Sequence, residues 1–147
     1  MRILLLEPFW AGSHAAWAEG LAHHSGHEIR ILSLPGRNWK WRMHGGAVSL
    51  ARRFLEEEPD PDAILATSLL DFSTFRALTA RRTAHVPAAI YFHENQFAYP
   101  WSPRDRSAEA GCDGHYGFIH HSAALAADAC WFSSVHNLST LLEGVRE

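Results

Sequence analysis

Polar side chains that can exchange protons follow an apolar run in the second half of the chain. Ala89–Phe92 carries only apolar and aromatic residues, the composition of a strand buried on both faces. It is followed at once by His93, Glu94, Asn95 and Gln96, which can donate or accept hydrogen bonds. Because open α/β sheets bind ligands beyond the carboxyl ends of their strands, the pattern predicts that His93 and Glu94 are catalytic and that Asn95 binds substrate. The alternative is a histidine that only ties down a loop beside a solvated glutamate.

A second polar group, Gly12-Ser13-His14, opens a predicted helix near the start of the chain. Gly12 can adopt a positive φ, Ser13 is placed to cap the helix, and the free N–H groups of a helix start attract anions. Capping leaves His14 unexplained, so we expect the three residues to bind substrate, with His14 meeting a phosphate or a sugar hydroxyl. The chain lacks the full glycine fingerprint of dinucleotide sites, which argues against such a cofactor. Ser134, after the last predicted strand, is expected to cap a helix and border the same crevice.

Cations alternate with aromatic residues after the second predicted strand. The residues are Arg37, Trp39, Lys40, Trp41 and Arg42, and no acidic residue lies among them. Bases stack on tryptophan faces while arginine and lysine contact phosphates, so the stretch is predicted to bind nucleic acid. The alternative is that one tryptophan anchors the loop and the charges are solvated.

Three histidines, His115, His120 and His121, lie on one predicted helix, and zinc uses such ligands. His115 and His120 are five positions apart and point in different directions, unlike the i, i+4 pairs of helical zinc sites, so we expect no metal. A serine hydrolase is set aside because the chain contains no GxSxG motif.

Strands and helices alternate along the whole chain. This predicts an α/β fold: a Rossmann-like three-layer domain with a parallel sheet of about five or more strands. The strand order 3-2-1-4-5 is expected, so the first and fourth strands would flank the switch point and face the Gly12 loop toward His93. The predicted strands are Arg2–Glu7, His27–Leu34, Asp62–Thr67, Val86–Phe92 and Ala129–Ser133. The predicted helices are Ala15–His24, Gly45–Glu58, Ser68–Arg82, His115–Asp128 and a last one from Ser134, with Arg37–His44 as a loop.

Length and composition indicate one globular domain over residues 1–147. A net charge of −3 argues against wholesale polyanion binding but permits a local basic patch. No apolar run approaches the roughly 18 residues of a membrane span, and the first residues are typical of a strand, not of a signal peptide. Cys112 and Cys130 match no metal or redox spacing, which predicts a reducing, cytoplasmic setting.

Four motifs taken together carry a family resemblance: LLEPFWAGSH, LPGRNWKWRMH, YFHENQFAYP and WFSSVHN. With them the chain resembles the amino-terminal domain of the tRNA-queuosine α-mannosyltransferase family, which sits among the retaining GT-B glycosyltransferases of family 4. The resemblance covers nearly the whole chain, and the HENQ and WKWR blocks carry most of it.

The resemblance implies the acceptor-side half of an enzyme that transfers mannose to queuosine in tRNA. GDP-mannose would be the co-substrate, with no other cofactor. The loop of Gly12, Ser13 and His14 would approach the donor phosphates and sugar, and His93 with Glu94 would lie against the transferred sugar. The sequence stops at Glu147, without the carboxy-terminal donor domain of such enzymes, so we expect this chain alone to be inactive. A non-catalytic Rossmann-like module that binds RNA or a nucleotide is the alternative, and the true acceptor and donor sugar stay open.

Overall fold

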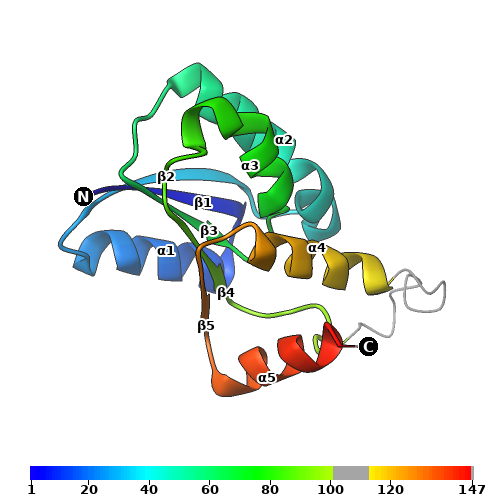
Figure 1. The fold of residues 1–147 in the computed structure, drawn as a ribbon. Coiled ribbons are helices and arrows are strands. Elements are labelled where there is room, and N and C mark those ends of the chain that lie inside the picture. The colour runs from blue at the N-terminus through cyan, green and yellow to red at the C-terminus, as the bar shows by residue number, and fades with distance from the viewer. Residues whose placement is uncertain (101–112, 147) are drawn as a thin grey trace.

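A parallel sheet lies between helices in the computed structural model, which describes residues 1–100 and 113–146, with only the backbone at 113 (Figure 1). The predicted α/β, Rossmann-like class is confirmed. The strands are β1 (Arg2–Trp10), β2 (Glu28–Pro35), β3 (Ala63–Thr67), β4 (Ala88–Phe92) and β5 (Ala129–Phe132). The helices are α1 (Gly12–His24), α2 (Trp39–Glu57), α3 (Phe72–Thr83), α4 (Asp113–Leu125) and α5 (Val135–Gly144). None of the helices in these ranges is long and apolar enough to cross a bilayer. Cys112 lies outside the described residues, and Cys130 is a half-buried free thiol in β5.

The order of the strands differs from the expected one. The sheet runs β2-β1-β3-β4-β5, so the predicted order 3-2-1-4-5 is wrong. β3 pairs directly with β1, with Ile3 opposite Ala63, and therefore separates β1 from β4. The reason lies in burial: β3 is almost entirely buried and takes a central place, whereas β2 exposes Glu28 and Arg30 and lies at an edge. The switch point is therefore between β1 and β3, not between β1 and β4.

Alternate residues of the central strands face different helical layers. Figure 1 shows α1 on one side of the sheet and α2, α3 and α4 on the other. In β4, Ile90 and Phe92 pack in the core formed with α2, α3 and α4, while Tyr91 packs with residues of α1. In β1, Leu4 and Leu6 face the first core and Leu5 faces α1. Because side chains alternate along a strand, the side chains at the ends of these strands also point to a defined side of the sheet.

Helices α1 and α2 begin earlier than predicted. Residues 37 and 38 lie outside any helix or strand, but residues 39–44 are not a loop, because α2 starts at Trp39. Trp39 and Met43 pack against residues of α4 such as Tyr116. This i, i+4 apolar pair continues the buried stripe of α2 into its first turn. Helix α1 starts at Gly12, before the predicted Ala15. The φ of Gly12 is +53°, and this positive value confirms what the sequence predicted. The cap is Ala11 without a side-chain hydrogen bond, so the prediction that Ser13 caps the helix is wrong.

Candidate active site

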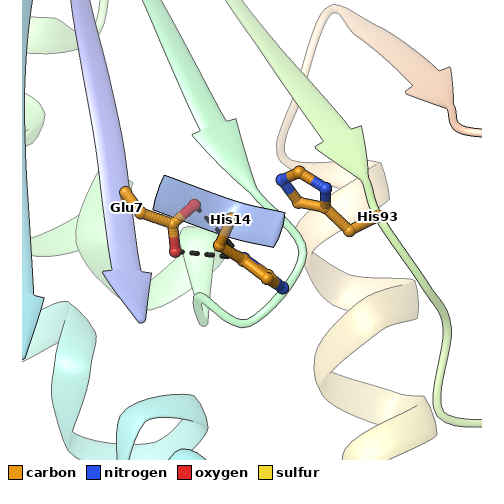
Figure 2. A group of neighbouring side chains, drawn as sticks. All are labelled: Glu7, His14 and His93. Carbon is orange, nitrogen blue, oxygen red and sulfur yellow. Dashed lines mark hydrogen bonds and ion pairs between the residues drawn. The ribbon is translucent and has the colours of Figure 1, made fainter. Parts of the chain in front are cut away.

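Glu7, His14 and His93 meet at the carboxyl ends of β1 and β4 (Figure 2). Glu7 has the same parity as Leu5 in β1, and His93 the same parity as Tyr91 in β4, so both point to the α1 side. His14 lies in the first turn of α1 and is 6% exposed. The predicted meeting of the Gly12 loop with His93 therefore occurs, although β3 lies between their strands.

Glu7 is the fully buried anchor of this group, with 0% exposure. Its Oε1 accepts the backbone N–H of Phe9 at 2.9 Å. Nδ1 of His14 lies 3.2 Å from Oε1 and 3.3 Å from Oε2 of Glu7. Because a carboxylate only accepts hydrogen bonds, Nδ1 of His14 must be the donor. The contact therefore fixes both the rotation of the imidazole and the position of one proton.

His14 lies between two carboxylates. Its Nε2 is 3.5 Å from Oε2 of Glu94, on the cleft side. Burial alone lowers the pKa of His14, but hydrogen bonds and charge attraction from Glu7 and Glu94 outweigh burial and raise the pKa to about 9. At neutral pH His14 is therefore a cation held in a partly closed site.

His93 is the neutral neighbour of that cation. Its ring lies 4.1 Å from the His14 ring, centroid to centroid, and 5.0 Å from Trp17. Burial, and secondarily the charge of His14, lower the pKa of His93 to about 3. Its Nε2 is buried and has no hydrogen-bond partner among the described residues, so this nitrogen can meet a ligand only if the ring moves. The His93 backbone carbonyl already accepts a bond from Ser133 Oγ at 2.8 Å, which leaves the side chain as the reactive part.

The same three side chains offer donor atoms of the type that metals use. One such atom each from Glu7, His14 and His93 lies within 4.8 Å of the other two. Both ring nitrogens of His14, however, face carboxylate oxygens, and the raised pKa keeps the ring protonated at neutral pH. A protonated imidazole has no lone pair for a metal. A metal ion would have to displace a proton from His14, and the contacts that the structure shows for this ring with Glu7 and Glu94 are hydrogen bonds and ion pairs.

Two adjoining hollows at this edge of the sheet could receive a ligand. One, of about 320 Å³, is lined by Gly12, Ser13, His14, Trp39 and Glu94, among others. The second, of about 250 Å³, is lined by His93, Asn95, Ser133, Ser134 and residues of α5. Glu94 and Tyr99 line both hollows, and we refer to the two hollows together as the cleft.

Asn95 and Ser134 are engaged in structural contacts on the β5 side of the cleft. The Asn95 amide donates to the Asn137 side chain at 2.8 Å and to Thr140 at 2.9 Å, and its oxygen accepts the N–H groups of Phe97 and Ala98. Ser134 caps α5, as expected, by accepting the N–H of Asn137 at 3.1 Å. Both residues border the cleft, but their side chains mainly tie the loop after β4 to α5.

The aromatic and basic residues at the start of α2 divide between the interior and the surface. Trp39 lines the larger hollow and packs against Tyr116, with 5.3 Å between ring centroids. Trp41 points outward and is 75% exposed. Arg37 is exposed, Lys40 lies 5.6 Å over the Trp39 ring, and Arg42 donates to the Pro35 carbonyl at 3.2 Å. One tryptophan thus anchors the helix while the other leaves an aromatic face open.

The three histidines of α4 do not converge. His115 is exposed and stacks on His44, with 4.7 Å between centroids. His120 is fully buried against Phe92. His121 is half-buried and takes part in no metal-ligating group within the described ranges.

Sequence reasoning missed Glu7 and the aromatic residues beside His93. In the sequence, Glu7 stands out only as the last residue of the predicted strand Arg2–Glu7. The sequence signal that could have placed Glu7 is the alternation of side chains along a strand. Residues 5 and 7 of β1 point to the same face of the sheet, which α1 covers. Trp17 stacks on Tyr91 at 4.3 Å, and both contact the His93 ring edge-on. No spacing in the sequence predicts that contact, because the two rings come from segments that are far apart in the sequence and meet only in the folded chain.

Comparison with known proteins agrees with this architecture. Residues 2–147 match the family described as tRNA-queuosine alpha-mannosyltransferase N-terminal. A curated relative from Drosophila melanogaster, named tRNA-queuosine alpha-mannosyltransferase, is 32% identical over an alignment of 148 positions that covers 98% of this chain. The matched part is 37% of the relative, so the chain spans little more than a third of that protein's length.

Proposed function

Because this chain belongs to the family of tRNA-queuosine α-mannosyltransferase amino-terminal domains, we propose that it is the acceptor-side domain of a retaining glycosyltransferase that acts on queuosine in tRNA. The proposed donor is GDP-mannose, and the proposed setting is the cytoplasm. The observation that carries the proposal is the contact between a charged His14 and a neutral His93 at the border of the cleft.

The two histidines suit the two charges that sugar transfer develops. Positive charge grows at the sugar carbon, and negative charge grows on the departing phosphate. A cationic His14, with its Nε2–H directed to the cleft side, is suited to the phosphate. A neutral His93, whose buried Nε2 has no partner among the described residues, would accept a hydrogen bond from a sugar hydroxyl once a movement of the ring exposes that atom. Glu94, beside both, would orient the sugar or the acceptor.

Gly12 and Ser13 complete the proposed donor end of the cleft. Both line the larger hollow, and Gly12 leaves the backbone open because nothing lies within 4 Å of where a Cβ would stand. The N–H groups at the start of α1 add positive potential for a phosphate. Asn95 and Ser134 would shape the other end of the cleft by holding α5 in place.

The start of α2 is the proposed tRNA contact. Trp41 offers an exposed ring for base stacking, and Arg37, Lys40 and Arg42 add positive charge beside the cleft. Trp39 would act indirectly, by fixing the helix that carries Trp41. The donor domain is proposed to be supplied by the rest of the full-length protein, so residues 1–147 alone should transfer no sugar.

Transfer by the full-length protein tests this function. We expect radiolabelled mannose to pass from GDP-mannose to tRNA that contains queuosine, and not to the same tRNA with guanosine at that position. Residues 1–147 alone should give no transfer. Tight tRNA binding by the full-length protein without transfer from any nucleotide sugar would instead favour a non-catalytic binding module.

A further inference from the structure

We propose that Glu7 is a positioning residue, whose buried carboxylate holds Nδ1 of His14 as a donor and so directs a second N–H, on Nε2, toward the cleft. The inference deepens the proposed function, on which its catalytic meaning rests. The arrangement itself can be tested without any substrate.

The contacts of Glu7 indicate that its role is to hold the His14 ring. The side chain is fully buried, and both carboxylate oxygens lie within 3.3 Å of Nδ1 of His14. The N–H of Phe9 fixes Oε1 from the other side at 2.9 Å. A buried carboxylate is costly unless it is paired and hydrogen-bonded, and here the pairing partner is His14. Glu7 does not line the cleft, so it acts on a ligand only through that ring.

The second nitrogen of His14 is held less tightly than the first. Nε2 lies 3.5 Å from Oε2 of Glu94, longer than the Glu7 contact, and Glu94 is partly exposed. An anionic oxygen of a ligand could therefore take over the Nε2–H without breaking the bond to Glu7. Glu7 thus fixes the ring of His14, and the ring presents its Nε2–H as a donor in a fixed position. A site that stabilises developing negative charge requires such a donor.

The charges around His14 come from two sides. Glu7 lies on β1, while Glu94 and His93 follow β4, and Tyr91 of β4 contacts His93. Removing the charge of Glu7 leaves burial and the weaker Glu94 contact to set the pKa of His14, so this pKa falls. A less charged His14 also repels a proton on His93 less, so the pKa of His93 rises.

Glu7→Gln separates the charge from the hydrogen bond. The amide is isosteric, and its oxygen can accept from both Phe9 and His14, so the ring orientation is retained. We expect imidazole NMR titration of residues 1–147 to move the midpoint of His14 down by about one pH unit or more, and to move the midpoint of His93 up. Glu19→Gln, on the exposed face of α1, is the matched control and should move neither. An unchanged His14 midpoint in Glu7→Gln would overturn the proposal.

A measurement on the unaltered chain covers the case in which Glu7→Gln does not fold. Once His14 has lost its second proton at high pH, the long-range ¹⁵N spectrum reports which nitrogen keeps the first. Glu7 requires Nδ1–H, so an Nε2–H tautomer contradicts the inference. If the NMR result holds and the full-length protein transfers no mannose, the proposed function fails while the role of Glu7 stands.

Discussion

His14 and His120 are buried histidines on different sides of the sheet, and they respond to burial in opposite ways. His14 contacts two carboxylates, and its pKa rises to about 9 despite the cost of burial. His120 faces Phe92 at 5.5 Å between centroids, neither of its ring nitrogens has a partner among the described residues, and burial lowers its pKa to about 3. His14 lines the cleft, and His120 belongs to the interior between α4 and β4.

The difference teaches that burial alone does not mark a reactive histidine in this domain. Burial favours the neutral ring in both cases, and only opposing charges reverse the effect. The buried acid Glu7 contacts His14, the histidine beside the cleft. His93 lies between the two extremes, since it is neutral like His120 but borders the cleft like His14.

The largest difference is expected in mannosyl transfer, when His93 at the cleft and His120 in the interior are replaced one at a time in the full-length protein. His93→Ala is expected to lower mannosyl transfer about 100-fold or more, the range for loss of one positioned catalytic group. His120→Leu should leave transfer near the wild-type rate, because its ring makes no hydrogen bond that the described residues show. Turnover and melting temperature are measured on the same preparations. Near-normal turnover of folded His93→Ala would reduce His93 to a brace for its loop.

Acid unfolding should separate the two classes of histidine next. His93 and His120 are neutral in the fold, so the unfolded chain binds protons near pH 6.5 and the folded chain only near the lowered pKa of about 3. Stability therefore falls as the pH drops through that window, by up to about 1.4 kcal/mol per pH unit for each group. His120→Leu should remove its share of that slope, as measured by urea unfolding at several pH values.

His14 contributes with the opposite sign. Its pKa is raised, so the stability it confers is complete below pH 6.5 and is lost as the pH rises toward about 9. His14→Gln should therefore abolish this loss of stability between pH 6.5 and about 9. Because it also removes a charge beside His93, it should raise the pKa of His93 and narrow the acid window in which His93 destabilises the fold. An acid slope in His120→Leu as steep as that of wild type would mean that His120 is not held neutral by burial.

The smallest effect is expected at the proposed tRNA contact. Reversing Arg37 and Arg42 to Glu in the full-length protein should weaken tRNA binding and reduce its salt dependence by about one unit of slope for each lost phosphate contact. Arg52→Glu, a reversal at an exposed position further along α2, is the matched control. Equal affinity of the double reversal and of the control, by filter binding at two salt concentrations, would show that the start of α2 is only structural.

The sequence predicted the elements of the fold better than their arrangement. Alternating apolar runs and helical stripes gave the α/β class and the five strands, because these patterns are local. The predicted strand order was wrong because the order depends on which strand can be buried on both sides. The charged Glu28 and Arg30 suit β2 to an edge, whereas the apolar β3 suits the centre of the sheet. The start of α2 was missed because its charges obscured the Trp39–Met43 stripe.

Part of the geometry of the candidate site, the meeting of His14 with His93, was predicted from the sequence. His14 and His93 were singled out because they end a strand or open a helix, and such positions are local features of the sequence. Their opposite charge states depend on Glu7, which lies in another element and acts only after folding. Asn95 shows the reverse case, because its amide is engaged with Asn137, 42 positions away, and no local pattern reveals that contact.

The protonation of three histidines at neutral pH, read in one long-range ¹⁵N spectrum of unaltered residues 1–147, tests the account most directly. Variants at each position assign the signals. The structure predicts protons on both nitrogens of His14 and on only one nitrogen of His93 and of His120. A neutral His14, or a charged His93, would contradict the claim that the cleft pairs a fixed cation with a neutral acceptor.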